Sequence, residues 1–201
     1  EEYPNGFQRG NYWWKEGSSI YSWAGYEYVG VDPETGKTQY NKYVPVLDEN
    51  GNDTGAKKAV IVNNACEATV VDLNKSAIPD LVGGFSTSAE YRGFDLSVQT
   101  AFQLGGYVRD SHYATLMNSG LSAGENLHKD MLNRWTPDNR YTDIPALYAN
   151  NQGAGIDNTS DYFLTKANYL SLKNVTLGYT LPAKLISKIG ISISITIFSI
   201  T

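Results

Sequence analysis

Two adjacent stretches of the sequence alternate between two kinds of side chain, and this alternation constrains the fold more than any other feature. The stretches are Phe85–Tyr91 and Phe94–Leu104, and only Arg92-Gly93 separates them. A period of two over about ten residues is typical of a β-strand with two unlike faces. We therefore predict a β-hairpin that reverses direction through a two-residue turn.

A second pair of alternating stretches lies further along the chain. In Tyr169–Thr180 apolar residues again alternate with small polar ones, and after Leu181-Pro182 the run Ile191–Ile197 alternates Ile with Ser or Thr. The last run is β-branched and uncharged, so it would be prone to aggregate if it stayed unpaired in water. We predict that these two stretches also form a pair of strands.

The connections between the predicted strands are very uneven in length. The first hairpin turns through two residues, whereas Gly105–Asn168 is far longer than ordinary loops, which seldom exceed about 12–15 residues. Short turns at one end of the strands and long loops at the other are typical of an outer-membrane β-barrel. Lipid offers no hydrogen bonds, so a sheet in a membrane must close on itself. A soluble β-sandwich would show the same alternation and stays open as an alternative.

We accordingly predict an all-β fold that is a portion of a large antiparallel transmembrane β-barrel with long extracellular loops. Even the smallest membrane barrels have about eight strands, so four strands cannot close alone. The expected organisation is an extracellular loop region with short hairpins at 1–84, a barrel hairpin at 85–104, a long extracellular loop with a short helix at 105–168, and a truncated barrel hairpin at 169–201. The helix patterns are Leu121–Arg134 and Ala183–Lys188.

The alternation assigns each strand residue to one of two faces. The apolar face would contact lipid, and we expect it to contain Phe94, Leu96, Val98, Val175, Leu177 and Tyr179. The polar face would line the lumen and contact water or a plug, and we expect it to contain Ser97, Gln99, Asn174 and Thr176.

Composition excludes several classes of function. The formal charge is −5 and no block of Lys or Arg occurs, so nucleic-acid binding is not expected. Cys66 is the single cysteine, which excludes an internal disulfide and a multi-thiolate metal site. We interpret Cys66 as a small packed residue and expect no cofactor.

Two groups of acidic residues are candidate chemical sites. Asp143, Asp157 and Asp161 could pair in a cleft for glycoside hydrolysis, but the sequence provides no pairing, and solvated loop acids fit it better. Asp48–Asp53 has spaced oxygen ligands that could suit calcium, although it lacks the EF-hand spacing and a plain turn is favoured. We therefore predict that the chain is not an enzyme.

Aromatic residues near the start of the chain are the main candidates for binding. Flat rings stack on sugar faces and supply rigid contact area at interfaces. The alternative is that the rings pack the loops together. The candidate contacts to a substrate or a lid are Trp13, Trp14, Trp23, Tyr26 and Tyr28. We interpret Trp135 as a structural anchor of its own loop.

Several blocks of the sequence resemble, in the same order, segments of the SusC/RagA-type TonB-linked outer-membrane transporters. The blocks are Tyr26–Gly36, Gly83–Ser97 with its continuation to Gly106, Arg134–Asn139 with Thr142–Pro145, and Tyr169–Pro182. The ordered set is highly specific. The chain matches the C-terminal part of such a protein, and Ser192–Thr201 departs from the family pattern.

The resemblance implies a location, partners and a mechanism. Such proteins are plugged barrels of about 22 strands in the outer membrane of Bacteroidota. They import glycans or peptides under a SusD-like surface lipoprotein, and the TonB complex acts through a plug region that this chain lacks. The function expected here is the C-terminal part of such a transporter. The rival interpretations are a secreted β-rich carbohydrate-binding or adhesion module and an extracellular hydrolase.

Overall fold

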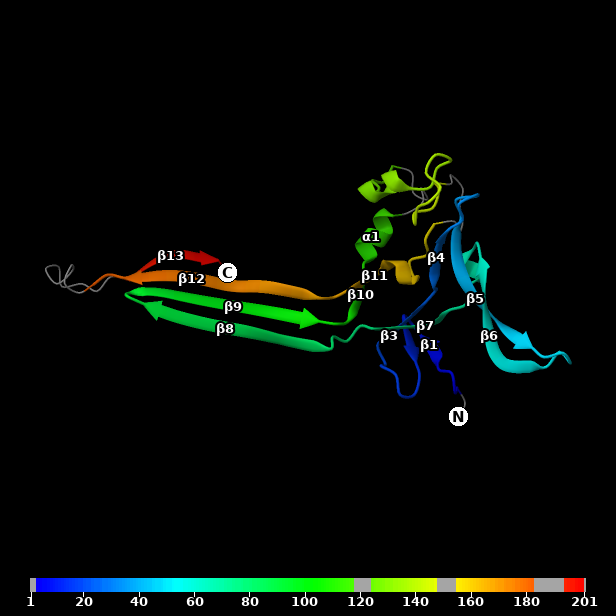
Figure 1. The fold of residues 1–201 in the computed structure, drawn as a ribbon, viewed down its shortest axis with the longest axis horizontal. Coiled ribbons are helices and arrows are strands. Elements are labelled where there is room, and N and C mark those ends of the chain that lie inside the picture. The colour runs from blue at the N-terminus through cyan, green and yellow to red at the C-terminus, as the bar shows by residue number, and fades with distance from the viewer. Residues whose placement is uncertain (1–2, 118–123, 148–154, 183–193, 201) are drawn as a thin grey trace. The chain divides into compact units, whose positions relative to one another are not determined.

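A computed structural model describes residues 3–117, 124–147, 155–182 and 194–200 of the 201-residue chain (Figure 1). The chain forms two compact units, and each unit contains two separate segments of the sequence. The first unit contains Glu1–Ala77 and Tyr107–Thr165, and the second contains Ile78–Gly106 and Lys166–Thr201. We describe each unit by itself.

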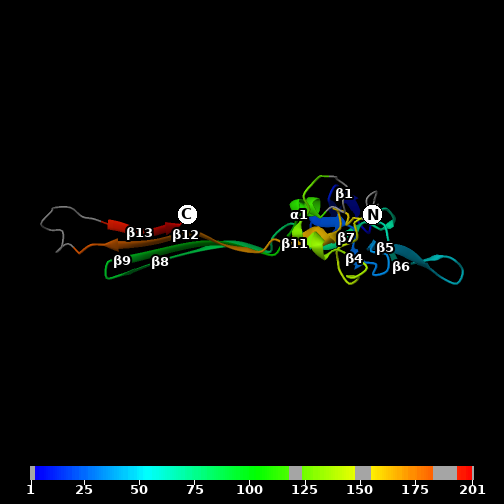
Figure 2. The ribbon, with the colours of Figure 1, turned by 90° about the horizontal axis from the view of Figure 1, so that it is seen from above.

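The second unit is a four-stranded antiparallel sheet in the order β13-β12-β9-β8. Its strands are β8 (Leu81–Tyr91), β9 (Phe94–Leu104), β12 (Tyr169–Thr180) and β13 (Ser194–Ile200). The predicted bounds of β9 and β12 are confirmed, whereas β8 begins at Leu81 rather than at Phe85. In Figure 2 the strands β8, β9 and β12 lie in one thin layer.

The two-residue turn between β8 and β9 is confirmed. Tyr91 pairs with Phe94, so only Arg92 and Gly93 lie outside the ladder. Both have positive φ angles, 49° for Arg92 and 87° for Gly93. Positive φ at both central residues is the geometry of a type I′ turn, whose twist matches that of the flanking strands.

The register of β9 against β12 sorts the strand residues into the two predicted sets. Phe94 pairs with Tyr179, and their ring centroids are 4.4 Å apart. The other cross-strand pairs repeat this sorting by type. They are Leu96 with Leu177, Val98 with Val175, Ser97 with Thr176, and Gln99 with Asn174.

The apolar face of this sheet has no covering layer among the described residues. Phe94 is 49% exposed and Leu96 is 43% exposed, and every buried hydrophobic residue in the described part of the chain belongs to the first unit. The soluble sandwich alternative predicts that Phe94, Leu96 and Val98 pack with Val175 and Leu177 in a dry core. The described residues do not form that core.

A β-bulge in β12 keeps the apolar residues on one face. Leu172 pairs with Thr100 and Asn174 pairs with Gln99, so Lys173 is an extra residue without a partner in β9. Without this bulge the alternation would place Leu172 on the same face as Asn174. Because the side-chain period of a strand is two, one extra residue reverses the assignment of everything beyond it.

Deletion of Lys173 should therefore be tolerated. The deletion closes the bulge and leaves every cross-strand pair on its present face, so we expect the amount of folded receptor to change by less than about twofold. The measurement is the folded fraction in membranes of cells that produce the receptor containing this chain. Deletion of Gln99 is the matched control. It must shift half of β9 by one residue against both neighbours, so it should remove most of the folded protein, and equal effects would contradict the bulge.

Strand β13 also contains a register shift. Its pairing with β12 runs from Val175 opposite Ile200 to Thr180 opposite Ser194. The shift lies between Leu177 and Gly178 of β12. The predicted pairing of these two stretches is confirmed for the described part, and the extra residue at the shift is Ile197, the last residue of the predicted alternation. Residues 191–193 lie outside the described residues.

The first unit contains three small sheets. The order β1-β2-β3-β7 joins β1 (Phe7–Arg9), β2 (Tyr12–Trp14), β3 (Ser22–Gly25) and β7 (Val71–Ser76). The order β4-β5-β6 joins β4 (Tyr28–Val31), β5 (Thr38–Leu47) and β6 (Asp53–Val62). The last sheet pairs β10 (Tyr107–Arg109) with β11 (Leu164–Lys166).

Short turns connect the strands of the β4-β5-β6 sheet. The segment Asp32–Gly36 joins β4 to β5, and the Asp32 carboxylate accepts hydrogen bonds from the backbone N–H of Glu34 and from the Thr35 hydroxyl. The Asp48 carboxylate likewise accepts from the backbone N–H groups of Asn50 and Asn52 in the turn from β5 to β6. Such side-chain bonds to nearby backbone are how Asp stabilises turns.

The helices are short and differ from the prediction. They are α1 (Ser111–Leu116) and three 3₁₀ turns, η1 (Ala65–Glu67), η2 (Lys129–Asn133) and η3 (Asp161–Phe163). The predicted helix Leu121–Arg134 is wrong where it can be compared, because residues 124–134 contain only η2. Met131 is buried, but Leu132 is 80% exposed, so the apolar residues of the predicted helix do not share a face. Residues 121–123 and the predicted helix Ala183–Lys188 lie outside the described residues.

The first unit has two hydrophobic clusters. Phe163 is the largest side chain of one cluster, which also contains Ala114, Met117, Met131, Ile144 and Ile156. Trp23, Leu73 and Leu164 form the other. Each cluster combines residues from both sequence segments of the unit or from distant parts of one segment.

None of the helices in the described ranges is sufficiently long and apolar to cross a membrane.

Candidate functional site

The predicted aromatic contacts lie in different environments of the first unit. Trp23 is 9% exposed, its indole N–H donates to the Tyr107 carbonyl, and the Arg109 guanidinium lies 4.9 Å from its ring centroid. Trp23 is therefore part of a core. Trp14 is half-buried, with the Arg9 guanidinium 4.4 Å from its ring centroid.

Tyr26 and Tyr28 belong to a group of tyrosines packed against Tyr40. The ring centroid of Tyr40 lies 6.1 Å from that of Tyr26 and 5.5 Å from that of Tyr28. The Tyr28 hydroxyl donates to the Asp143 carbonyl at 2.8 Å. Burial raises the pKa of Tyr28 well above its usual range and raises the pKa of Tyr40 to about 12. These rings are neutral packing elements at physiological pH.

Trp13 is the predicted aromatic residue that borders a groove. The groove has a volume of about 570 Å³, which is within the range typical of small-ligand sites. We call it the β2–β6–β7 groove, after three of the four strands that line it; the fourth is β5, which contributes Tyr43. It is lined by Asn5, Trp13, Lys15, Glu27, Tyr43, Gly55, Lys57, Thr69, Val70, Val71, Asp72 and Asn74.

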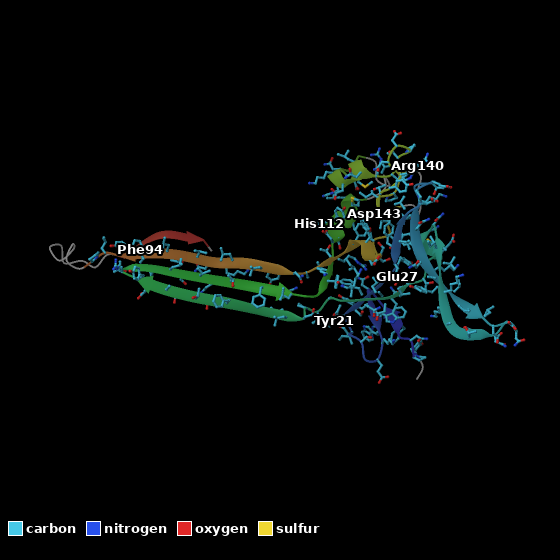
Figure 3. The ribbon with its side chains drawn as sticks, in the orientation of Figure 1. Tyr21, Glu27, Phe94, His112, Arg140 and Asp143 are labelled. Atoms are coloured by element: carbon cyan, nitrogen blue, oxygen red, sulfur yellow. The ribbon has the colours of Figure 1, made fainter. Side chains whose placement is uncertain are left out.

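Glu27 is held in position at the groove by neighbouring side chains. The Tyr43 hydroxyl donates to Glu27 Oε2 at 2.6 Å, and the Asn41 amide donates to the same oxygen at 3.0 Å. The hydrogen bond to Glu27 raises the pKa of Tyr43, because it favours the protonated phenol. Tyr43 is fixed in turn, since its backbone N–H donates to the Thr69 hydroxyl at 3.0 Å. Figure 3 labels Glu27 within the first unit.

Asp72 is the second carboxylate of the groove and is also held on one oxygen. Its Oδ1 accepts from the Ser22 hydroxyl and from the backbone N–H of Asn74 at 2.9 Å. Asn74 has a φ of 51°, which places it in the left-handed region that Asn tolerates better than most residues. Asn74 lies within β7, where the ladder to β3 shifts register between the Ala24–Asp72 and Ser22–Ser76 pairs.

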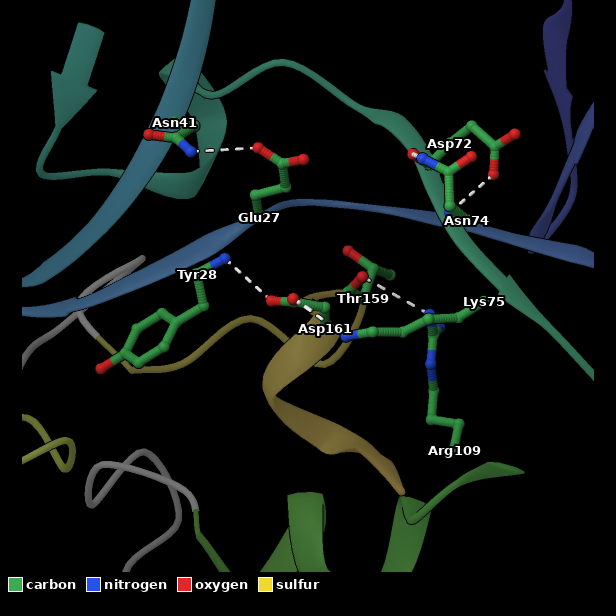
Figure 4. A network of polar contacts seen from close by, with 9 residues as sticks. All are labelled: Glu27, Tyr28, Asn41, Asp72, Asn74, Lys75, Arg109, Thr159 and Asp161. Carbon is green, nitrogen blue, oxygen red and sulfur yellow. Dashed lines mark hydrogen bonds and ion pairs between the residues drawn. The ribbon is translucent and has the colours of Figure 1, made fainter. Parts of the chain in front are cut away.

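A polar network ties the wall of the groove to the rest of the unit (Figure 4). Lys75 Nζ lies 3.1 Å from Asp161 Oδ2, and the backbone N–H of Tyr28 donates to Asp161 Oδ1 at 2.9 Å. Arg109 donates to the Thr159 carbonyl at 3.4 Å. These contacts join four distant stretches of the sequence, so the residues of the network act as supports of the unit.

The acidic residues considered for hydrolysis are engaged in structural contacts. Asp161 pairs with Lys75, and Asp157 accepts from the backbone N–H and the hydroxyl of Thr159. The backbone carbonyl of Asp143 accepts from Tyr28. In the described ranges, none of these contacts joins two of the three carboxylates as a catalytic pair.

The calcium candidate at Asp48–Asp53 is a hairpin turn in which Asp48 accepts from its own backbone. Across residues 3–117, 124–147, 155–182 and 194–200, no group of three His, Cys, Asp or Glu side chains could hold a metal ion. The plain turn favoured by the sequence is present, and calcium binding there stays the less favoured and untested alternative.

Trp135 anchors its loop as predicted. Its indole N–H donates to the Pro33 carbonyl at 3.1 Å, and its backbone N–H donates to the Ile144 carbonyl at 2.8 Å. A Cβ atom at Gly36 would lie 2.6 Å from the ring, so the ring packs directly on that glycine. Gly36 also has a φ of 71°, which a residue with a side chain adopts only with strain.

Several groove residues were not singled out by sequence reasoning. Glu27, Tyr43, Asp72 and Lys57 lie far apart in the sequence and follow no motif spacing. Their only local signals are a tyrosine-rich β5 and the Asp72–Asn74 turn. Long-range packing brings them together, which pattern analysis of one sequence does not detect.

No protein-family model matches the chain. Among curated proteins, TonB-dependent receptor P3 of Formosa agariphila is 30% identical over 188 residues, which are 88% of this chain and 17% of that protein. TonB-dependent receptor SusC of Bacteroides thetaiotaomicron is 30% identical over 158 residues, which are 77% of this chain and 13% of that protein. The chain thus spans less than a fifth of the length of these curated relatives.

Solved structures agree with the curated relatives. The structure of the RagAB peptide transporter matches with a TM-score of 0.69 and 30% identity, over 88% of this chain and 18% of that chain. The RagAB peptide importer in the closed-closed state matches with a TM-score of 0.73 and 27% identity, over 98% of this chain and 21% of that chain.

Proposed function

We propose that this chain, a SusC/RagA-type segment by its sequence and its fold, forms part of the barrel wall and of the extracellular loops of a TonB-dependent outer-membrane transporter. The matched relatives are receptors and importers rather than enzymes, which fits a non-enzymatic role. Substrate would be captured at the cell surface and released inward through the barrel.

The sheet of the second unit is the observation that carries this proposal. Its strands β8, β9 and β12 are each about as long as a membrane-crossing strand, which needs about 9–11 residues. One face is apolar and exposed, and no hydrophobic core of the described residues lies behind it. A sheet of this kind is unstable alone in water, but it suits a wall with lipid on one side and a wet lumen on the other.

The proposed orientation follows from the register. Phe94, Leu96, Val98 and their partners in β12 would face lipid, while Ser97, Gln99, Asn174 and Thr176 would face the lumen. Transmembrane barrels place short turns in the periplasm and long connections outside the cell. The Arg92-Gly93 turn would therefore be periplasmic, and the first unit, which contains the long connection 107–165, would be extracellular.

The partners of the whole transporter are also part of the proposal. A SusD-like surface lipoprotein would cover the extracellular side, and the TonB complex would act through a plug domain elsewhere in the transporter. The substrate would be a glycan or a peptide. The RagAB structures are described as those of a peptide transporter and a peptide importer, so the substrate of those proteins is a peptide.

Thiol labelling in intact cells tests the proposed location and orientation. Cys66 is exposed in the first unit, so its interpretation as a small packed residue is wrong, and it provides a native probe. In a receptor whose other thiols are removed, a membrane-impermeant maleimide should label Cys66 on intact cells. A Cys66→Ser/Arg92→Cys variant should react only after the outer membrane is permeabilised. Labelling of Arg92→Cys on intact cells, or absence of the receptor from the outer-membrane fraction, would contradict the proposal.

A further inference from the structure

Lys173 is the single lysine or arginine in the described strands of the second unit's sheet. Strands β8, β9, β12 and β13 otherwise contain neither residue type. Lys173 is exposed, and neither ion pair of the described residues includes it. It is also the extra residue of the bulge in β12, so Lys173 and Asn174 both lie opposite Gln99. Lys173 is therefore a candidate for a contact that the sheet itself does not supply.

The bulge sets Lys173 at the middle of the sheet along the strand direction. Gln99 is the central residue of the eleven in β9, so its level is equally far from both ends of that strand. In the proposed orientation this level is the middle of the bilayer. Lysines near the ends of a membrane segment reach the interface with their long side chains. A lysine at the centre is the farthest from both interfaces.

The register alone does not assign Lys173 to a face, but the cost of placing a charge in lipid does. Alternation counted forward from Leu172 puts Lys173 on the polar face, whereas alternation counted back from Asn174 puts it on the apolar face. A lysine on the lipid face is most destabilising at the bilayer midplane and least so near the interfaces. Lys173 therefore belongs on the lumen face, beside Asn174 and Gln99.

The carboxylates in the described strands of this sheet are too far away to neutralise Lys173. They are Glu90 and Asp95, which lie opposite each other beside the turn from β8 to β9. Asp95 is four residues from Gln99, and a strand rises about 3.3 Å per residue, so about 13 Å separates these two levels. The opposite charge for Lys173 must come from outside the described strands.

A charge at this depth of a plugged barrel faces protein rather than bulk water. A charge buried against protein is unfavourable unless an opposite charge pairs with it. We propose that Lys173 forms an ion pair with a carboxylate of the plug domain and so holds the plug in the resting transporter. This inference rests on the proposed transport function, which includes a plug in the barrel, and it assigns the retention of that plug to a residue of this chain.

Hydrogen exchange of the plug amides, measured by mass spectrometry on the detergent-purified receptor without substrate, tests the inference. Lys173→Met removes the charge and keeps a long side chain, so plug amides at the contact should exchange about tenfold faster. Lys173→Glu should accelerate exchange further, because it brings two like charges together. Lys173→Arg keeps the charge and should stay within about twofold of the wild type. Lys58→Met removes an exposed lysine of β6 and is the matched control, which should have no effect.

Three outcomes would overturn the inference. Plug exchange could be unchanged in Lys173→Met, or Lys173→Met and Lys173→Arg could have equal effects. The amount of folded Lys173→Met receptor in the outer membrane could also rise by more than about twofold, which would place the lysine on the lipid face. A receptor that shows the expected thiol labelling but one of these results refutes the role of Lys173 alone. A receptor that fails the labelling experiment refutes the transport function itself, so the two failures are distinguishable.

Discussion

Replacing Val98 with arginine should remove most of the folded receptor from the outer membrane. Val98 lies near the middle of β9 and pairs with Thr87 of β8 and Val175 of β12, on the apolar face of the sheet. Arginine on the lipid face of a barrel costs about 2–4 kcal/mol near the bilayer midplane. A cost of that size is a large fraction of the stability of a typical domain. The measurement is the amount of folded receptor in the outer-membrane fraction, resolved on an unboiled gel.

Gln99→Arg is the matched control for this experiment. Gln99 is adjacent in the same strand but pairs with Ser86 and Asn174 on the polar face. An arginine there would extend into a wet lumen, so we expect a change within about 0.5 kcal/mol. If both variants folded like the wild type, the apolar face would not lie in lipid. If Gln99→Arg were the more harmful, the assignment of the two faces would be reversed.

Replacing Phe163 with alanine should strongly destabilise the first unit. Phe163 is 1% exposed, and it packs with residues of α1, η2 and the loop near Ile144. Truncation of a buried Phe to Ala costs about 3–5 kcal/mol, because it removes buried apolar area and leaves a cavity. For a unit of this size that should lower the midpoint of thermal unfolding by about 10 °C. The measurement is protease susceptibility of the purified receptor as a function of temperature.

Leu132→Ala provides the comparison within the same region. Leu132 belongs to η2, as does the buried Met131, but it is 80% exposed. Its truncation should change stability by no more than about 0.5 kcal/mol. Equal shifts for Phe163→Ala and Leu132→Ala would mean that the cluster around Phe163 does not stabilise the unit.

The strands of the second unit were predictable because their signal is local. The bounds of β9 and β12 follow directly from the alternation, and the turn at Arg92-Gly93 follows from the break between two alternating runs. The start of β8 was missed because Gly83 and Gly84 have no side chain to continue the pattern. Phe102 covers Gly83 from the neighbouring strand, which a single strand cannot reveal.

The bulge at Lys173 had a readable signal that the face assignment did not use. The apolar positions change from even numbers at Leu170 and Leu172 to odd numbers at Val175 and Leu177. Such a change of phase within one strand indicates an extra residue. A search for phase changes would have placed the bulge between Leu172 and Val175.

The first unit was far less predictable because its contacts are between distant residues. Its strands β1, β2, β3 and β4 contain three or four residues each, which is too few to establish a period. Trp23 was expected at a binding surface, but it packs with Leu73 and Leu164 from other parts of the chain. Composition alone does not distinguish an aromatic residue in a core from one at a ligand site.

The division of the first unit into two sequence segments has a consequence for the order of assembly. The cluster of Trp23, Leu73 and Leu164 closes only when residues before Ala77 meet residues after Tyr107. The β8–β9 hairpin is encoded between these segments and is contiguous, so its contacts are local in sequence. Contacts between distant residues form more slowly than local ones. The N-terminal segment can therefore complete this cluster only after the chain has extended through the whole hairpin and on to Leu164.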